Sequence, residues 1–87
     1  MIHHRREIEP SVSVSRTVID LVSDITGQSP LGLSPLEWTI DTAAIDELFS
    51  ASRSRASNGL TVSFNYEGHR ITVYEDRSVE TEPLFEV

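Results

Sequence analysis

The stretch LTVSFNYEGHRITVY, residues 60–74, decides the fold of this chain. Its first half alternates apolar and polar residues, which is the pattern of a half-buried β-strand. Glu67 and Gly68 then provide a two-residue hairpin turn. When Tyr66 faces His69, the apolar residues of both halves share one face: Leu60, Val62, Phe64, Ile71 and Val73. A slip by one residue would turn Ile71 and Val73 to the other face, so the register is well specified.

Two helices are predicted before the hairpin. The first carries an apolar stripe at helical spacing, formed by Val14, Val18, Leu21, Val22 and Ile25. Ser11 or Ser13 is its expected N-cap, and Gly27 its C-terminal cap. Residues 28–39 are interrupted by prolines but remain apolar, so they are predicted to form a packed connector in which Ser29 caps a single helical turn. Asp41 caps the second helix, in which Ile40 packs on Ile45 and which fades near Ser52.

The remaining segments complete one domain. Residues 50–59 are rich in serine and predict a loop, residues 75–78 a turn, and residues 79–82 a short third strand. The expected fold is therefore α+β, with two helices packed on one face of a three-stranded antiparallel sheet. Residues 11–83 form the domain. Residues 1–10 read as a flexible lead-in, for which a short edge strand near Ile8 is the alternative, and residues 84–87 as a tail.

The charged residues indicate a salty environment. Fourteen acids face seven bases for a net charge of -7, and every base is arginine. Near 1 M salt the Debye length is about 3 Å, so repulsion among the acids is screened while their hydration is kept. We interpret the acidic, lysine-free composition as halophilic, the alternative being chance in a mildly acidic protein. The chain has no cysteine and no stretch typical of a membrane span or signal peptide, so a cytoplasmic location is expected.

Several segments resemble the halobacterial output domain 1 family. They are the serine and valine run that starts at Ser11, Ser29-Pro30, the segment SPLEWTID at residues 34–41, and the hairpin segment VSFNYEGHRITV at residues 62–73. The resemblance covers about residues 11–79. The family usually has proline where Ser34 stands, tyrosine at or next to Trp38, and Pro-Asp where this chain has Thr42-Ala43. The resemblance implies haloarchaeal origin and a signalling output role, in a domain that occurs alone or at the C-terminus of receiver and sensor proteins. It supplies no catalytic residues.

Candidate sites for chemistry each have a simpler explanation. His3 and His4 could hold a metal ion loosely, but a free tail is favoured. His69 could act as a general base, but a cross-strand pair with Tyr66 is favoured. Asp41 is already used as a cap, whereas Asp46 and Glu47 are expected on a solvated helix flank rather than at a metal. No catalytic residue, metal ligand or cofactor is therefore predicted.

Two candidate interaction features remain. Trp38 is expected in the core, with a partly exposed interface anchor as the alternative. The outer face of the hairpin lacks acids in an otherwise acidic chain, so it is either a docking face or an ordinary solvated face; it consists of Thr61, Ser63, Asn65, Arg70, Thr72 and Tyr74. The last strand, or the strand at residues 60–66 if it lies at an edge, offers backbone for strand addition between chains.

The favoured function is a non-catalytic protein-interaction module of haloarchaeal signalling or regulation, whose partner is another protein or a second copy of the chain. The alternative is a nucleic-acid-binding regulator, because helix, helix and hairpin in that order resemble a winged helix. Arginines could line one side of it: Arg53, Arg55, Arg70 and Arg77. The net charge and the expected salt concentration disfavour nucleic acid. An enzyme is a weaker third hypothesis, because the sequence has no nucleophile, phosphate-loop or metal motif.

Overall fold

The computed structural model describes residues 3–49 and 60–84 of the chain. Along these residues the elements follow in this order: β1 (His4–Glu7), α1 (Val14–Thr26), the 3₁₀ turns η1 (Pro30–Gly32) and η2 (Leu36–Trp38), α2 (Thr42–Leu48), β2 (Thr61–Tyr66), β3 (His69–Tyr74) and β4 (Ser78–Pro83). The loop predicted at residues 50–59 and the helix end predicted near Ser52 lie outside the described residues.

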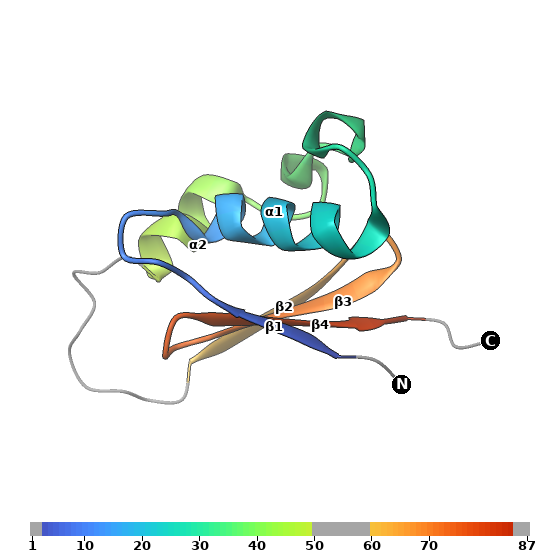
Figure 1. Cartoon of the computed structure of the whole chain (residues 1–87). Helices are drawn as coiled ribbons and strands as arrows, with labels where there is room; N and C mark the ends of the chain where they lie inside the picture. The colour runs from blue at the N-terminus through green and yellow to red at the C-terminus, as the bar shows by residue number, and fades with distance from the viewer. Residues whose placement is uncertain (1–2, 50–59, 85–87) are drawn as a thin grey trace.

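The strands form one antiparallel sheet with α1 and α2 on a single face of it (Figure 1). The strand order is β1-β4-β3-β2, so the α+β class is confirmed but the count of three strands is wrong. The additional strand, β1, pairs Arg6 with Val79 and Glu7 with Ser78. Its sequence HRRE has no apolar alternation. As an edge strand, β1 is held in the sheet by its backbone pairing with β4 and by contacts of its charged side chains.

The hairpin has the predicted register. Tyr66 pairs with His69, and the ladder continues to Thr61 opposite Tyr74 without a bulge. Glu67 and Gly68 have φ angles of 51° and 75°, the left-handed pair that a type I′ turn requires. At the other end of β3 the chain reverses through Arg77, whose φ is 64° and whose N–H donates to the carbonyl of Tyr74 at 3.0 Å.

Both helices begin at the predicted caps. The Ser13 side chain accepts a hydrogen bond from the Arg16 N–H, and Gly27, with φ 75°, ends α1. Asp41 accepts from the Ala44 N–H at the start of α2. Each cap satisfies backbone groups that a helix end leaves without partners. The predicted turn capped by Ser29 is η1, where the serine oxygen accepts from the Leu31 N–H at 3.2 Å.

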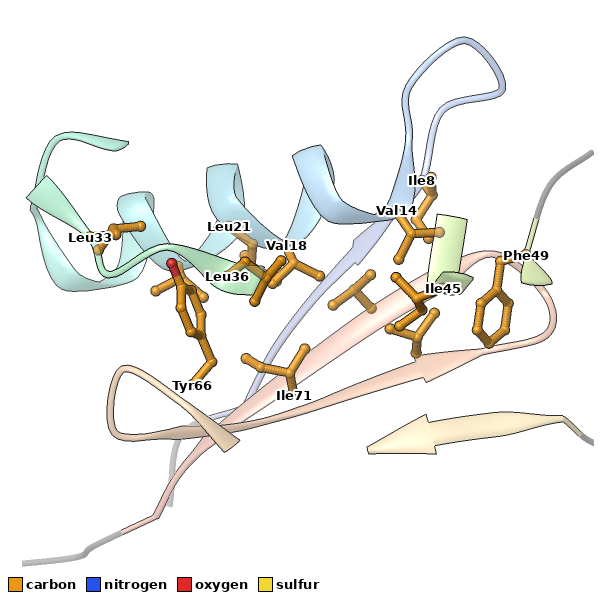
Figure 2. Close-up of a cluster of buried hydrophobic side chains, with 13 residues drawn as sticks. Ile8, Val14, Val18, Leu21, Leu33, Leu36, Ile45, Phe49, Tyr66 and Ile71 are labelled. Carbon is orange, nitrogen blue, oxygen red and sulfur yellow. The ribbon is translucent and has the colours of Figure 1, made fainter. Parts of the chain in front are cut away.

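The core lies between the helices and the sheet. Figure 2 shows α1 contributing Val14, Val18 and Leu21 from above, while the sheet contributes Ile71 from below. Phe49 and Ile45 close the end of the core near α2, and the connector closes the other end. The most deeply buried strand residues are Ile71, Val73 and Val79, each fully buried. On the sheet face opposite the helices, no element of the described residues covers the strands.

Candidate interaction surface

The sheet face opposite the helices brings together the six predicted hairpin residues. Because side chains alternate along a strand and Ile71 and Val73 point into the core, the residues between them point away from it. Thr61, Ser63 and Asn65 are exposed on β2. Cross-strand pairing sets them opposite Tyr74, Thr72 and Arg70 respectively. We call this side of the sheet, together with the outward residues of β4 and β1, the outer sheet face.

The outer sheet face as a whole is not poor in acids. Strand β4 pairs with β3 and sets Glu80 opposite Thr72 and Glu82 opposite Arg70. The expectation of an acid-poor face holds for the hairpin alone, because it did not include β4 as a neighbour on the same face. The face is therefore divided into a neutral side on β2 and a charged side on β4 and β1.

A network of polar contacts fixes the charged side. The Tyr74 hydroxyl donates to Glu80 Oε1 at 2.8 Å, and the Arg5 guanidinium lies 5.2 Å from the Tyr74 ring centroid, within cation–π range. The hydrogen bond to Glu80 raises the pKa of Tyr74, burial and the Glu80 charge raise it further, and Arg5 lowers it. Arg5 also donates to Ser78 Oγ at 2.7 Å. This side is thus already engaged in contacts within the chain.

The neutral side borders a hollow of about 350 Å³. It is lined by residues of three strands: Thr61, Ser63, Arg70, Thr72, Tyr74, Glu80, Thr81 and Glu82. Five of the six predicted hairpin residues line it, and Asn65 does not. Ser63 and Thr72 hydroxyls lie 3.2 Å apart in it. Its hydroxyl groups and mixed charges suit polar contacts rather than an apolar ligand.

Trp38 lies on the other side of the molecule, in η2. The connector that carries η2 lies on the helix side of the sheet (Figure 1). Trp38 is 80% exposed, so the expectation that it fills the core is wrong. Leu36, two residues earlier, fills the core instead, because in the tight η2 turn these two side chains point in different directions. Leu31 of η1 is 97% exposed.

Trp38 is exposed on a fixed backbone. The Trp38 N–H donates to the Pro35 carbonyl at 3.1 Å, which closes the η2 turn. The preceding residue, Ser34, is tied to the hairpin tip twice: its N–H donates to Glu67 Oε2 at 2.6 Å, and its carbonyl accepts from the Tyr66 hydroxyl. Figure 2 shows the Tyr66 ring rising from the sheet toward the connector. An exposed tryptophan on a hydrogen-bonded turn is a favourable anchor for binding, because little backbone entropy is lost on contact.

The candidate residues for metal or acid–base chemistry have structural roles. His3 lies 3.8 Å from Glu80 and 3.5 Å from Glu82, and His69 Nδ1 lies 2.8 Å from the Glu67 carbonyl. Asp46 is not on a solvated flank, because its carboxylate accepts from the Ser15 N–H and hydroxyl at 2.8 and 2.9 Å and so joins α2 to the start of α1. Within residues 3–49 and 60–84 no group of three His, Asp or Glu side chains is arranged to hold a metal.

Two of the four arginines named in the winged-helix hypothesis lie within the described residues, and their environments differ. Arg70 is exposed on the outer sheet face. Arg77 donates through its guanidinium to the carbonyls of Phe49, Glu9 and Val12, which fixes the β3–β4 turn against the rest of the fold. Its structural role was not recognised from the sequence, because nothing in the EDR segment marks a non-glycine residue with positive φ. Arg53 and Arg55 lie outside the described residues, so the hypothesis stays a prediction.

Comparison with known proteins identifies a family. Residues 10–83 match the family model described as Halobacterial output domain 1. Neither the curated proteins nor the solved structures contain a significant match to the chain. Of the helices in the described part, none is long and apolar enough to cross a membrane.

Proposed function

Because the chain belongs to the halobacterial output domain 1 family, we propose that it is a non-catalytic module that delivers a signalling output by binding other proteins. The family gives it an output role in haloarchaeal signalling. We further propose that the domain delivers this output by binding a protein partner, in a cytoplasm rich in salt. The domain then needs a rigid surface with an anchor residue, and it needs no reactive group.

The observation that carries the proposal is the exposure of Trp38. An exposed tryptophan leaves a large apolar surface in contact with water. Burial of this surface is favourable by about 25 cal/mol for each Å² removed from water. Tryptophan is among the residues most enriched in binding hot spots. Trp38 and Leu31 are the two most exposed large apolar residues in the described part of the chain, and both belong to the connector pinned to the hairpin tip. We name the exposed surface of these two residues the connector surface.

Affinity capture from a haloarchaeal host lysate at about 2 M KCl tests the proposal, because surface charges are almost fully screened there. The wild-type chain is expected to retain a partner that Trp38→Ala loses, while Trp38→Ala keeps the cooperative unfolding transition because residue 38 is outside the core. Thr72→Ala is the matched control on the outer sheet face. Loss of the partner with Thr72→Ala but not with Trp38→Ala would contradict the assignment to the connector surface, and retention of the partner by both variants would contradict both surfaces.

The nucleic-acid alternative has one observation in its favour. Arg70 is exposed on the outer sheet face, and the described residues form no ion pair with it. Phosphate contacts lose affinity steeply with salt, so we expect no gel shift of host promoter DNA by the isolated chain at high KCl. A salt-resistant shift that Arg70→Gln abolishes would favour this alternative over the protein-binding proposal.

A further inference from the structure

The two edges of the sheet differ in how they are protected. Edge strand β1 has four residues, three of them charged: Arg5, Arg6 and Glu7. Short length and charge are the usual protection of an edge against pairing with another chain. The opposite edge, β2, has the sequence TVSFNY and six residues in unbroken register with β3. It contains no charge, no proline and no bulge, and no described strand lies beyond it.

The hairpin geometry shows which backbone groups β2 offers at its open edge. In a two-residue hairpin, the residues that flank the turn exchange both hydrogen bonds, here Tyr66 and His69. Hydrogen-bonded and non-bonded positions then alternate along the strand. Accordingly, the N–H and C=O groups of Thr61, Ser63 and Asn65 point away from β3. These three residues also place their side chains on the outer sheet face.

An antiparallel second copy of β2 satisfies all three residues at once. A two-fold axis through Ser63, perpendicular to the sheet, pairs Ser63 with itself and Thr61 with Asn65 of the second copy. About six backbone hydrogen bonds result, two for each such pair. The same register sets Val62 opposite Phe64 of the other copy on the core side, where both are only half-buried in the single chain. Apolar residues thus face apolar residues and polar ones face polar ones.

An apolar groove lies beside this edge. It measures about 290 Å³ and is bounded by Val62 on the sheet and by residues of α2 and its start: Ile40, Asp41, Ala44, Ile45 and Leu48. Ala44 and Leu48 are four residues apart and lie on one side of α2, and Ile40 precedes the Asp41 cap of the helix. Leu48 is 39% exposed. A two-fold axis at Ser63 brings the grooves of the two copies next to each other above the joined strands.

The distribution of charge favours a second copy over a basic partner. The chain carries a net charge of -7, and two copies repel each other wherever their acids meet. Strands β2 and β3 contain no Asp or Glu, so this side can approach a like-charged molecule. A basic partner would find no acid on these two strands, and Asp41 at the groove already accepts the Ala44 N–H.

We propose that the chain forms a two-fold symmetric dimer by antiparallel pairing of β2 with β2 of a second copy, centred on Ser63. The two sheets then join into one continuous sheet, and the connector surfaces of both copies remain available to a partner. The dimer deepens the proposed function and rests on it, because it doubles the sites by which an output module binds its target.

Light scattering of the full chain at high KCl tests the dimer directly. The wild-type chain is expected to have twice the 9.7 kDa mass of one chain. Ser63→Pro removes an outward N–H, which a monomer tolerates at an edge, so this variant is expected to have the single mass and still unfold cooperatively. Ser63→Ala keeps the N–H and is expected to remain dimeric. A wild-type chain of single mass at all concentrations, or a dimeric Ser63→Pro variant, would overturn the proposal.

Cysteine cross-linking tests the register even where Ser63→Pro fails to fold. The natural chain has no cysteine, so each introduced thiol reports on its own position. Hydrogen-bonded antiparallel pairs have a Cα separation near 5.5 Å, within disulfide reach. Ser63→Cys is expected to form a disulfide-linked dimer on oxidation. Thr61→Cys and Asn65→Cys are each expected to remain unlinked alone and to link when mixed.

The cross-linking and the partner-capture experiments test the dimer and the proposed function independently of each other. If Ser63→Cys does not link, or Thr61→Cys links with itself, the β2 pairing is wrong. Partner capture that depends on Trp38 would then still support the output module. Conversely, a dimer with the expected linkages and no Trp38-dependent partner would leave the pairing intact and refute the connector surface.

Discussion

Arg77 joins distant segments of this small domain through the hydrogen bonds of its side chain. It has a positive φ that costs a non-glycine residue about 1–3 kcal/mol. Its guanidinium reaches the carbonyls of Phe49, Glu9 and Val12, which belong to segments far apart in the sequence. The planar fork of arginine donates several hydrogen bonds in fixed directions. The hydrogen bonds offset the backbone strain and close the turn onto the core.

We expect Arg77→Lys to lower the free energy of unfolding by about 1.5–3 kcal/mol, the range for hydrogen bonds to a charged group. Arginine and lysine carry the same backbone strain at a positive φ. The difference in the free energy of unfolding between the wild-type chain and Arg77→Lys therefore reports the lost hydrogen bonds. Arg70→Lys is the matched control on an exposed site and is expected to change stability by less than about 0.5 kcal/mol. Urea unfolding measures both, and equal effects would contradict the role given to Arg77.

The raised pKa of Tyr66 predicts a loss of folding stability at alkaline pH. Burial, and then the charges of Glu67 and Glu37, raise the pKa of Tyr66 above its ordinary value of 10.0. A raised pKa in the folded state means that the stabilisation is fully present below about pH 10 and is lost as pH rises through the folded-state pKa. Tyr66→Phe is expected to cost about 0.5–1.5 kcal/mol at neutral pH and to flatten the alkaline decline in Tm. An unchanged decline in the variant would contradict this assignment.

At the scale of elements, the hairpin could be predicted in full because one alternating pattern and one two-residue turn leave a single register. Strand β1 could not, since Arg5 and Arg6 carry no periodic apolar signal and their partners Asp76 and Asp24 are distant in sequence. The six hairpin residues of the candidate surface could be predicted from the same alternation. The exposure of Trp38 could not, because its apolar character equally suits a core.

The hairpin turn can be tested at Gly68. Its φ is 75°, and an added Cβ would meet nothing within 4 Å, so Gly68→Ala changes the backbone energy alone. We expect a loss of about 1–2 kcal/mol, the cost of the left-handed conformation for an L-residue. Gly32→Ala is the control, because this glycine has no positive φ and the added Cβ would lie 3.9 Å from Gln28 Oε1. Equal thermal stability of the two variants would contradict the turn assignment.

At the scale of the whole molecule, the net charge of -7 sets the conditions under which the fold is stable. Ion pairs in the structure are largely exposed, such as Arg6 with Asp24 at 2.6 Å, and exposed pairs contribute at most about 1 kcal/mol each. They do not offset the general repulsion among the acids. Salt is the remaining means of screening that repulsion.

We therefore expect the midpoint of urea unfolding to rise when KCl is raised from about 0.1 M to about 2 M, since the Debye length falls from about 10 Å to below 3 Å over this range. The comparison of the two midpoints is the measurement. A midpoint that does not change with KCl would contradict the halophilic interpretation.

Binding of a protein partner by the connector surface through Trp38 can be followed by the fluorescence of Trp38. The chain has a single tryptophan, so its emission reports one site. Trp38 is 80% exposed, and the free chain should therefore emit at the long wavelength of a tryptophan in water. On addition of the captured partner at high KCl we predict a shift to shorter wavelength, which Thr72→Ala keeps. An unchanged emission maximum while the partner binds would contradict the claim.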